Sequence, residues 1–156
     1  MSIDPSIATI GYSVWKEENL FTHGYYRVSG GKVLPLRERL IDIDKWVREK
    51  LTEFAPDLVV LEEQIFRSFG GSEKFGVKNI RNLVCAYTTI LIAIPDFITV
   101  DEFQPSQWMR RRDKHKLQEQ CEKLYGVIGN HNAIDAIMMA VHWFDVKKPK
   151  QRELAF

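Results

Sequence analysis

The stretch that decides the fold is Pro56-Asp57-Leu58-Val59-Val60-Leu61-Glu62-Glu63. Its proline and aspartate end the amphipathic segment that precedes them, and residues 58–61 form an unbroken apolar run. A short run without polar alternation, bounded by turn residues, is typical of a buried strand that is covered on both faces. The run stops abruptly at two glutamates, so the sequence predicts a buried strand with a carboxylate at its end.

Before this strand, the chain has the pattern of a three-strand meander followed by one long helix. Residues 10–15 and 20–28 alternate apolar and polar side chains, and residues 1–4 are expected to form a very short strand before them. Pro35 occupies a plausible first helical position, and apolar residues recur at three- and four-residue spacing from there to Phe54. The first third of the chain is therefore expected to supply three strands and an amphipathic helix.

After the stretch, helical and strand patterns alternate. We expect a loop, a helix, a short strand that ends at Asp101-Glu102, and three helical segments, the last capped by Asn130. These segments cover residues 67–72, 73–93, 97–100, 106–112, 114–125 and 130–144. Three opening strands followed by alternating helices and strands predict an α/β fold with a central mixed sheet of five strands. One domain is expected over residues 1–146, with a basic C-terminal tail at 147–156.

The composition is that of an ordinary globular chain of 156 residues, 45% apolar and 28% charged. No apolar run reaches the roughly 20 residues that a membrane span needs, and no signal-peptide pattern opens the chain. Cys85 and Cys121 have no metal-ribbon or redox spacing, so both are expected to be small buried hydrophobes. These features predict a reduced, cytoplasmic protein.

The net charge of +1 conceals a concentrated basic cluster. Six basic residues fall within seven positions, and four more lie in the tail: Arg110, Arg111, Arg112, Lys114, His115 and Lys116, then Lys147, Lys148, Lys150 and Arg152. A local cluster of this kind can neutralise several phosphates even in a neutral chain. The alternative is a solvated helix start and a disordered tail.

Three carboxylates occupy unusual positions. Asp4 lies on the first strand, Glu62 ends the apolar strand, and Asp135 stands in an otherwise apolar helix. A carboxylate beside buried strands is costly unless it is paired or binds a metal. Oxygen ligands suit Mg²⁺ or Mn²⁺, and two such ions about 3.5–4 Å apart can hydrolyse a phosphodiester. Taken singly, the first could be a turn residue and the second could form a salt bridge, whereas an acid in an apolar helix needs a partner.

Four segments resemble RuvC-type Holliday junction resolvases, in the order in which that family carries them. They are residues 2–6 with Gly11-Tyr12-Ser13-Val14, then residues 56–64, then Phe103-Gln104-Pro105-Ser106-Gln107-Trp108, and finally Asn132-Ala133-Ile134-Asp135-Ala136. The resemblance covers nearly the whole chain and implies an RNase H-like fold with helices on both faces of the sheet. It also implies a homodimer that uses Mg²⁺ to nick opposed strands of four-way DNA junctions. The small size would suit a bacteriophage member.

By this resemblance, Asp4 bridges two metal ions, Glu62 binds one of them and Asp135 binds the other. Family members usually carry a second acid, or sometimes a histidine, three residues before the last aspartate. This chain has Asn132 at that position, with His131 beside it. Both residues share the helix face of Asp135, so either can supply a neutral ligand to a more weakly held second ion.

The resemblance leaves two candidates for the glutamate ligand. Counting from Pro56-Asp57 selects Glu62, whereas aligning Gln64-Ile65-Phe66 with the family pattern selects Glu63. Adjacent strand residues face opposite sides of a sheet, so only one of the two can reach the site. We expect Glu62 to be the ligand.

Lys116 matches the start of a helix in the family and is predicted to contact the scissile phosphate. Further DNA contacts are expected from Phe66, Arg67, Lys74, Arg110, Arg111, Arg112 and Lys114. Phe66 could stack on bases at the junction centre, or it could be an ordinary core residue. Each cation could instead be a solvated surface charge.

The leading hypothesis is a structure-selective DNA endonuclease that resolves junctions by paired nicks. An RNase H-like nuclease that cuts RNA–DNA hybrids is an alternative, because site and substrate vary on one scaffold. A branched-DNA-binding protein with weakened catalysis is the other alternative, and Asn132 is the residue that suggests it.

Overall fold

The computed structural model describes residues 1–30, 33–63, 77–109 and 114–153, and for residues 77, 78 and 148–153 only the backbone. Five strands and five helices are assigned within these ranges. Their order is β1 (Ser2–Asp4), β2 (Thr9–Lys16), β3 (Asn19–Arg27), α1 (Leu36–Phe54), β4 (Leu58–Glu62), α2 (Val77–Ala93), β5 (Thr99–Phe103), α3 (Pro105–Trp108), α4 (Lys114–Tyr125) and α5 (His131–Glu153).

The strands form one sheet in the order β3-β2-β1-β4-β5. The β1–β2 and β2–β3 pairs are antiparallel, whereas β4 is parallel to both β1 and β5. The three-residue β1 is therefore a central strand with partners on both sides. The predicted mixed five-stranded sheet and α/β class are confirmed.

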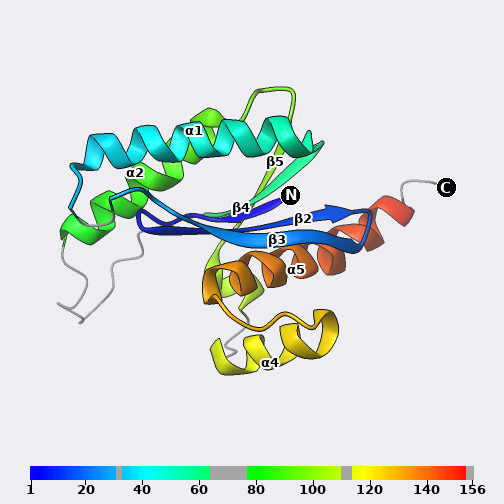
Figure 1. Cartoon of the computed structure of the whole chain (residues 1–156). Helices are drawn as coiled ribbons and strands as arrows, with labels where there is room; N and C mark the ends of the chain where they lie inside the picture. Colours follow the sequence, from blue (N-terminus) through cyan, green and yellow to red (C-terminus); the bar gives the residue numbers. More distant parts are fainter. Residues whose placement is uncertain (31–32, 64–76, 110–113, 154–156) are drawn as a thin grey trace.

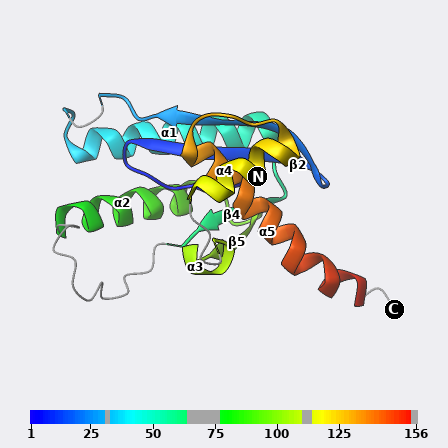
Figure 2. The same cartoon turned by 90° about the horizontal axis from the view of Figure 1, so that it is seen from below.

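Helices cover both faces of this sheet. Figure 1 shows α1 and α2 on one face and α5 on the other, with α4 on the outer side of α5. In the orthogonal view, α4 and α5 lie in front of the strands (Figure 2). The apolar run of β4 is explained by burial on both faces of the sheet. Val59 and Leu61 pack in the core with α1 and α2, and Val60 packs in the core with α5. A strand buried on both faces has no position for an alternating polar side chain.

Several element boundaries differ from the sequence prediction, and the differences at β5 and α1 have a clear cause in the backbone. Strand β5 begins at Thr99 rather than at residue 97, because Ile98 N–H donates to Pro95 in a turn and pairing starts only after it. The strand continues to Phe103, so Asp101 lies inside it. Pro35 is the N-cap of α1 rather than its first helical residue, with ψ at 149°.

The last helix is longer than predicted. It continues past Phe144 to Glu153, and Trp143 Nε1 and Lys147 Nζ both reach the Asp101 carboxylate on β5, at 2.6 and 3.3 Å. The predicted boundary between residues 146 and 147 therefore falls inside α5, and the division into domain and tail stays a prediction. Helix α3 ends at Trp108, and the rest of the predicted segment 106–112 lies partly outside the described residues. Within the described ranges, none of the helices combines the length and apolar character of a membrane span.

Candidate active site

Three carboxylates meet at one edge of the sheet. Asp4 is the last residue of β1, and Glu62 is the last residue of β4. The two strands are parallel neighbours with Ile3 opposite Leu61, so both carboxylates leave the sheet at the same edge. Asp135 lies in the second turn of α5, which packs against β1 and β2.

The alternation of side chains places Asp4 and Glu62 on the face that α5 covers. Two residues before each acid, the side chain already contacts this helix layer. Ser2 Oγ donates to the Ala136 carbonyl at 2.7 Å, and Val60 belongs to the core cluster under α5. Because strand side chains repeat every two residues, the acids that follow share that face.

The other two acids perturb Asp4 electrostatically. Desolvation raises the pKa of Asp4 well above its ordinary value of 3.8, and the carboxylates of Glu62 and Asp135 raise it further. The Lys114 ammonium acts in the opposite direction. Burial and like charges both disfavour the ionised form of Asp4, and a cation bound beside it would favour that form.

Lys114, the first residue of α4, supplies one positive charge. Its Nζ lies 3.6 Å from Oδ2 of Asp135, a residue that is only 8% exposed. Desolvation raises the pKa of Asp135, while Lys114 and then His131 lower it. The structure therefore brings Lys114 to the carboxylates, whereas Lys116, predicted for the phosphate contact, is an exposed residue further along the helix.

Glu62 and Glu63 separate as the strand geometry requires. Glu62 accepts a hydrogen bond of 3.1 Å from Trp108 Nε1, on the α5 side of the sheet. Glu63 lies on the opposite side, near α2. Desolvation and a hydrogen bond to Glu102 raise the pKa of Tyr87 in α2, and the Glu63 carboxylate raises it further. The structure thus places Glu62, and not Glu63, in the carboxylate cluster.

The first turn of α5 rests directly on the backbone of β2. A Cβ atom on Gly11 would lie 1.9 Å from the Asn132 carbonyl oxygen, so only glycine allows this approach. The Asn132 side-chain amide also donates to the Thr9 carbonyl. That contact gives Asn132 a role in attaching the helix to the sheet, and its predicted role as a metal ligand stays a prediction. His131, the other candidate, is exposed at the start of α5 and close enough to Asp135 to lower its pKa.

A buried hydroxyl pair anchors α5 one residue beyond Asp135. Ser2 and Ser13 face each other across β1 and β2, and neither is exposed. Their Oγ atoms are 2.5 Å apart, and Ser2 donates to the Ala136 carbonyl. Trp15 Nε1 donates to Ser13 Oγ at 2.7 Å, and the Ser13 hydroxyl also lies 3.4 Å from the Ala136 carbonyl, so the indole, the two hydroxyls and the helix form one hydrogen-bond network. We call Ser2, Ser13 and the Ala136 carbonyl the serine clasp.

Sequence reasoning missed the serine clasp, the Gly11 contact and the ion pair of Lys114 with Asp135. Two of them had a signal in the sequence. Serines at inward-facing positions of strands need hydrogen-bond partners, and a glycine inside a strand indicates a close approach of another backbone. The predicted DNA contacts Phe66, Arg67, Lys74, Arg110, Arg111 and Arg112 lie outside the described residues.

The donor chemistry of the cluster suits a hard cation, although its side chains are not preformed around one. Among the described residues, no three His, Cys, Asp or Glu side chains are grouped so that they could hold an ion as they stand. However, Asp4 has a raised pKa because it is desolvated beside two other acids. A divalent cation reverses that effect, since it favours the ionised form of each carboxylate around it.

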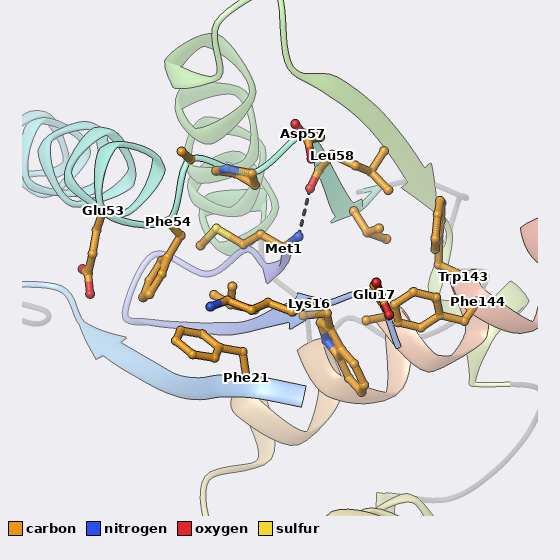
Figure 3. Close-up of a pocket in the computed structure, with 16 residues that line it drawn as sticks. Met1, Lys16, Glu17, Phe21, Glu53, Phe54, Asp57, Leu58, Trp143 and Phe144 are labelled. Atoms are coloured by element: carbon orange, nitrogen blue, oxygen red, sulfur yellow. Dashed lines mark hydrogen bonds between the residues drawn. The ribbon is translucent and has the colours of Figure 1, made fainter. Parts of the chain in front are cut away.

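A pocket of about 710 Å³ lies at the other end of the sheet, where β1 and β4 begin. Figure 3 shows Met1, Phe21, Phe54, Trp143 and Phe144 around it, together with the hydrogen bond from the Met1 amino group to the Leu58 carbonyl. None of the predicted site residues lines this pocket. The acidic edge of the sheet, rather than this pocket, is therefore the candidate active site.

The sheet order, the helices on both faces and the acids at the ends of β1 and β4 define an RNase H-like α/β protein. No family model matches the chain. The chain is 27% identical over 163 aligned residues to the crossover junction endodeoxyribonuclease RuvC of Thermomicrobium roseum, covering 98% of this chain and 96% of that protein.

Two solved structures have the same fold. T. thermophilus RuvC in complex with Holliday junction substrate matches with a TM-score of 0.71 and 22% identity, over 90% of this chain and 88% of that one. A second Thermus thermophilus RuvC structure matches with a TM-score of 0.65 and 21% identity, over 90% and 89%. The predicted resemblance to RuvC-type resolvases and the RNase H-like fold are confirmed. A bacteriophage origin stays a prediction.

Proposed function

We propose that the protein is a Mg²⁺-dependent endonuclease that resolves four-way and other branched DNA junctions by paired nicks. The observation that carries the proposal is the meeting of Asp4, Glu62 and Asp135 at one edge and one face of the sheet. The full-length similarity to a crossover junction endodeoxyribonuclease, and the shared fold with a RuvC bound to a Holliday junction, support DNA junctions as the substrate.

The three acids would hold the metal, with Asp4 between the other two. Two bound Mg²⁺ or Mn²⁺ ions would activate water and stabilise the leaving oxygen of the phosphodiester. The protein keeps these carboxylates in place. Trp108 donates to Glu62, and the serine clasp fixes the helix next to Asp135. Asn132 or His131 would complete the ligand set.

Lys114 is the cation best placed to meet the scissile phosphate. Its ammonium already lies against Asp135, and its side chain remains 64% exposed, so it can reach a DNA phosphate at the same edge. Lys116 and the predicted basic residues Arg110, Arg111 and Arg112 would extend the contact along the DNA. A homodimer would bring two such sites to opposed strands, as two-fold symmetry requires for paired nicks. Cleavage of DNA junctions is consistent with the predicted cytoplasmic location.

The decisive experiment compares three labelled substrates: a four-way junction, a fork and an RNA–DNA hybrid. Each is incubated with the wild-type protein and Asp4→Asn, in Mg²⁺, Mn²⁺ or EDTA. We expect symmetric nicks on the junction that require metal and disappear in Asp4→Asn. The variant should still bind the junction, because asparagine keeps the shape of the side chain.

The other outcomes separate the alternatives. Cleavage of the hybrid alone would exclude a resolvase and favour the RNase H-like reading. Tight junction binding without cleavage under any metal would favour a branched-DNA-binding protein, as the engagement of Asn132 with Thr9 suggests.

A further inference from the structure

Strand β3 presents a row of exposed side chains on the same face of the sheet as the carboxylates. In the register, Asp4 pairs with Gly11, and Gly11 pairs with Tyr25. Paired residues point to the same side, and the missing Cβ of Gly11 faces α5. Tyr25 therefore lies on the α5 face, whereas its neighbour Tyr26 stacks on Trp46 of α1 on the other face.

This row also ends at the same edge of the sheet as the carboxylates. Because β2 runs antiparallel to β1, and β3 antiparallel to β2, β3 runs in the direction of β1 and both strands end there. Arg27 is the last residue of β3, as Asp4 is of β1. Two strand spacings separate them across the sheet, and Arg27 lies two residues beyond Tyr25, which is the residue in register with Asp4, so the two are about 12 Å apart. The first turn of α5, with exposed His131, lies between them.

The end of β3 carries a preformed cationic group. The guanidinium of Arg27 lies over the Tyr25 ring, 5.8 Å from its centroid, and both residues are exposed. Among the described residues, no ion pair occupies this guanidinium, and β3 contains no acidic residue. An arginine held against an aromatic ring keeps its planar fork available for bidentate contact with a phosphate.

We propose that Arg27, positioned by Tyr25, binds the phosphate backbone of a DNA arm that leaves the carboxylate site over the first turn of α5. About 12 Å corresponds to about three to four nucleotides along one strand of a duplex, at 3.4 Å each. One strand can therefore reach Asp4 and Arg27 together. The positive end of the α5 dipole lies along this path and favours the same phosphates. Arg27 makes the contact, and Tyr25 positions it.

This inference rests on the proposed function, because it assigns a surface to the DNA of that reaction. The test measures binding of a fluorescent four-way junction between 50 and 200 mM salt, with Ca²⁺ in place of Mg²⁺ to limit cleavage. It compares Arg27→Gln with Arg48→Gln, a matched loss of charge on α1 at an exposed position on the other face of the sheet. Melting curves check that each variant is folded.

We expect Arg27→Gln to bind about eightfold more weakly at 0.1 M salt and to lower the salt slope by about 0.9, the value for one lost phosphate contact. Arg48→Gln should match the wild type. Tyr25→Leu should lose about two- to fivefold in affinity, and Tyr25→Phe should lose nothing, because the ring alone positions the guanidinium.

Three results would overturn the inference. Equal binding by Arg27→Gln and Arg48→Gln would show that DNA does not reach β3. If Arg27→Gln binds the junction more weakly but keeps the salt slope of the wild type, the substitution has a structural effect and removes no phosphate contact. Both would leave the proposed function intact if the wild-type protein binds and cuts the junction. A wild-type protein that does not bind the junction would remove the proposed function and this inference together.

Discussion

Glu62 and Glu63 are adjacent carboxylates with different surroundings, so a single-atom change in each should separate them. Glu62→Gln removes a charge from the cluster around Asp4, and we expect junction cleavage in Mg²⁺ to fall by at least about 100-fold. Glu63→Gln changes a side chain near Tyr87 on the other face and should cut within about threefold of the wild-type rate. Single-turnover cleavage of a labelled junction measures both rates. Loss of cleavage in Glu63→Gln alone would reverse the assignment.

Asp4 should make the metal-free protein less stable as the pH rises. Its pKa is higher in the folded chain than the ordinary 3.8, because of desolvation and the two neighbouring acids. Between the unfolded and folded pKa values, the folded state holds a proton that the unfolded state has released. The free energy of unfolding therefore falls through this window and stays low above it.

The variant Asp4→Asn removes this effect and should be more stable than the wild type at pH 8 in EDTA. A gain of about 1 kcal/mol would raise Tm by about 2–4 °C for a chain of this size. At pH 3, where the unfolded aspartate is protonated too, the two Tm values should converge. Adding Mg²⁺ at pH 8 should raise Tm of the wild type only, since ligand binding stabilises the state that binds it. A constant difference in Tm at all pH values would contradict the assignment.

At the scale of elements, the order of strands and helices follows from local sequence patterns, whereas their boundaries depend on contacts with residues that are distant in the sequence. The apolar run of β4 and the amphipathic spacing of α1 both have a periodicity that the sequence shows directly. The end of α5 has no such signal. It extends past Phe144, where Trp143 and Lys147 contact Asp101, which is 42 or more positions away in the sequence.

The candidate site also has one part that the sequence shows directly and one part that depends on tertiary packing. The three acids stand out because carboxylates are unusual at strand ends and in an apolar helix. The partners of these acids come from tertiary packing. Lys114 was one of several cations in a basic cluster, and only the packing of α4 beside α5 brings it to Asp135. The sequence allows two registers, one with Glu62 and one with Glu63 as the ligand. The packing of β4 between the two helix layers decides which glutamate faces the other acids.

Gly11 is predicted to control how closely α5 approaches the sheet. In Gly11→Ala, the new Cβ would meet backbone atoms of Asn132, which no change of side-chain rotamer can relieve. Moving the helix should cost about 1–3 kcal/mol of stability and weaken Mg²⁺ binding by displacing Asp135. Gly24→Ala is the control, because its Cβ would meet only the Tyr12 side chain at 3.1 Å. Chemical denaturation and metal titration measure the two effects; equal losses in both variants would contradict the prediction.

The serine clasp should also stabilise the packing of α5 against the sheet. Ser13→Ala leaves the Trp15 indole N–H without its acceptor and removes one hydroxyl from the chain that ends at the Ala136 carbonyl. An unsatisfied donor costs about 1–3 kcal/mol when it is fully buried, and Trp15 is half-buried, so urea denaturation should show a loss near the lower end of that range. Thr52→Ala is the control: its hydroxyl donates to a helix carbonyl at an exposed position, so its loss should be much smaller. A stability equal to that of the wild type would mean that the clasp does not stabilise the fold.

At the scale of the whole molecule, the sheet separates two layers with different roles. Helices α1 and α2 build one core with the sheet, and α5 builds the other together with α4. All three acids, Lys114 and Arg27 belong to the second layer or to its edge. Under the proposed function, the described residues that would meet DNA therefore lie on the α5 side, which would leave the α1 and α2 side for the proposed second subunit.

If two subunits act together, an inactive partner should convert paired nicks into single nicks. The test uses a supercoiled plasmid that extrudes a cruciform, with wild-type protein mixed with increasing amounts of Asp4→Asn. A mixed dimer has one working site, so nicked circles should accumulate at the expense of linear DNA. Independent monomers nick the two strands separately, so they would give the same excess of nicked circles when wild-type protein is diluted without the variant, whereas a preformed dimer would keep its ratio of linear to nicked DNA on dilution. Gel analysis of the ratio of nicked to linear DNA therefore distinguishes a functional dimer from two unrelated cleavage events.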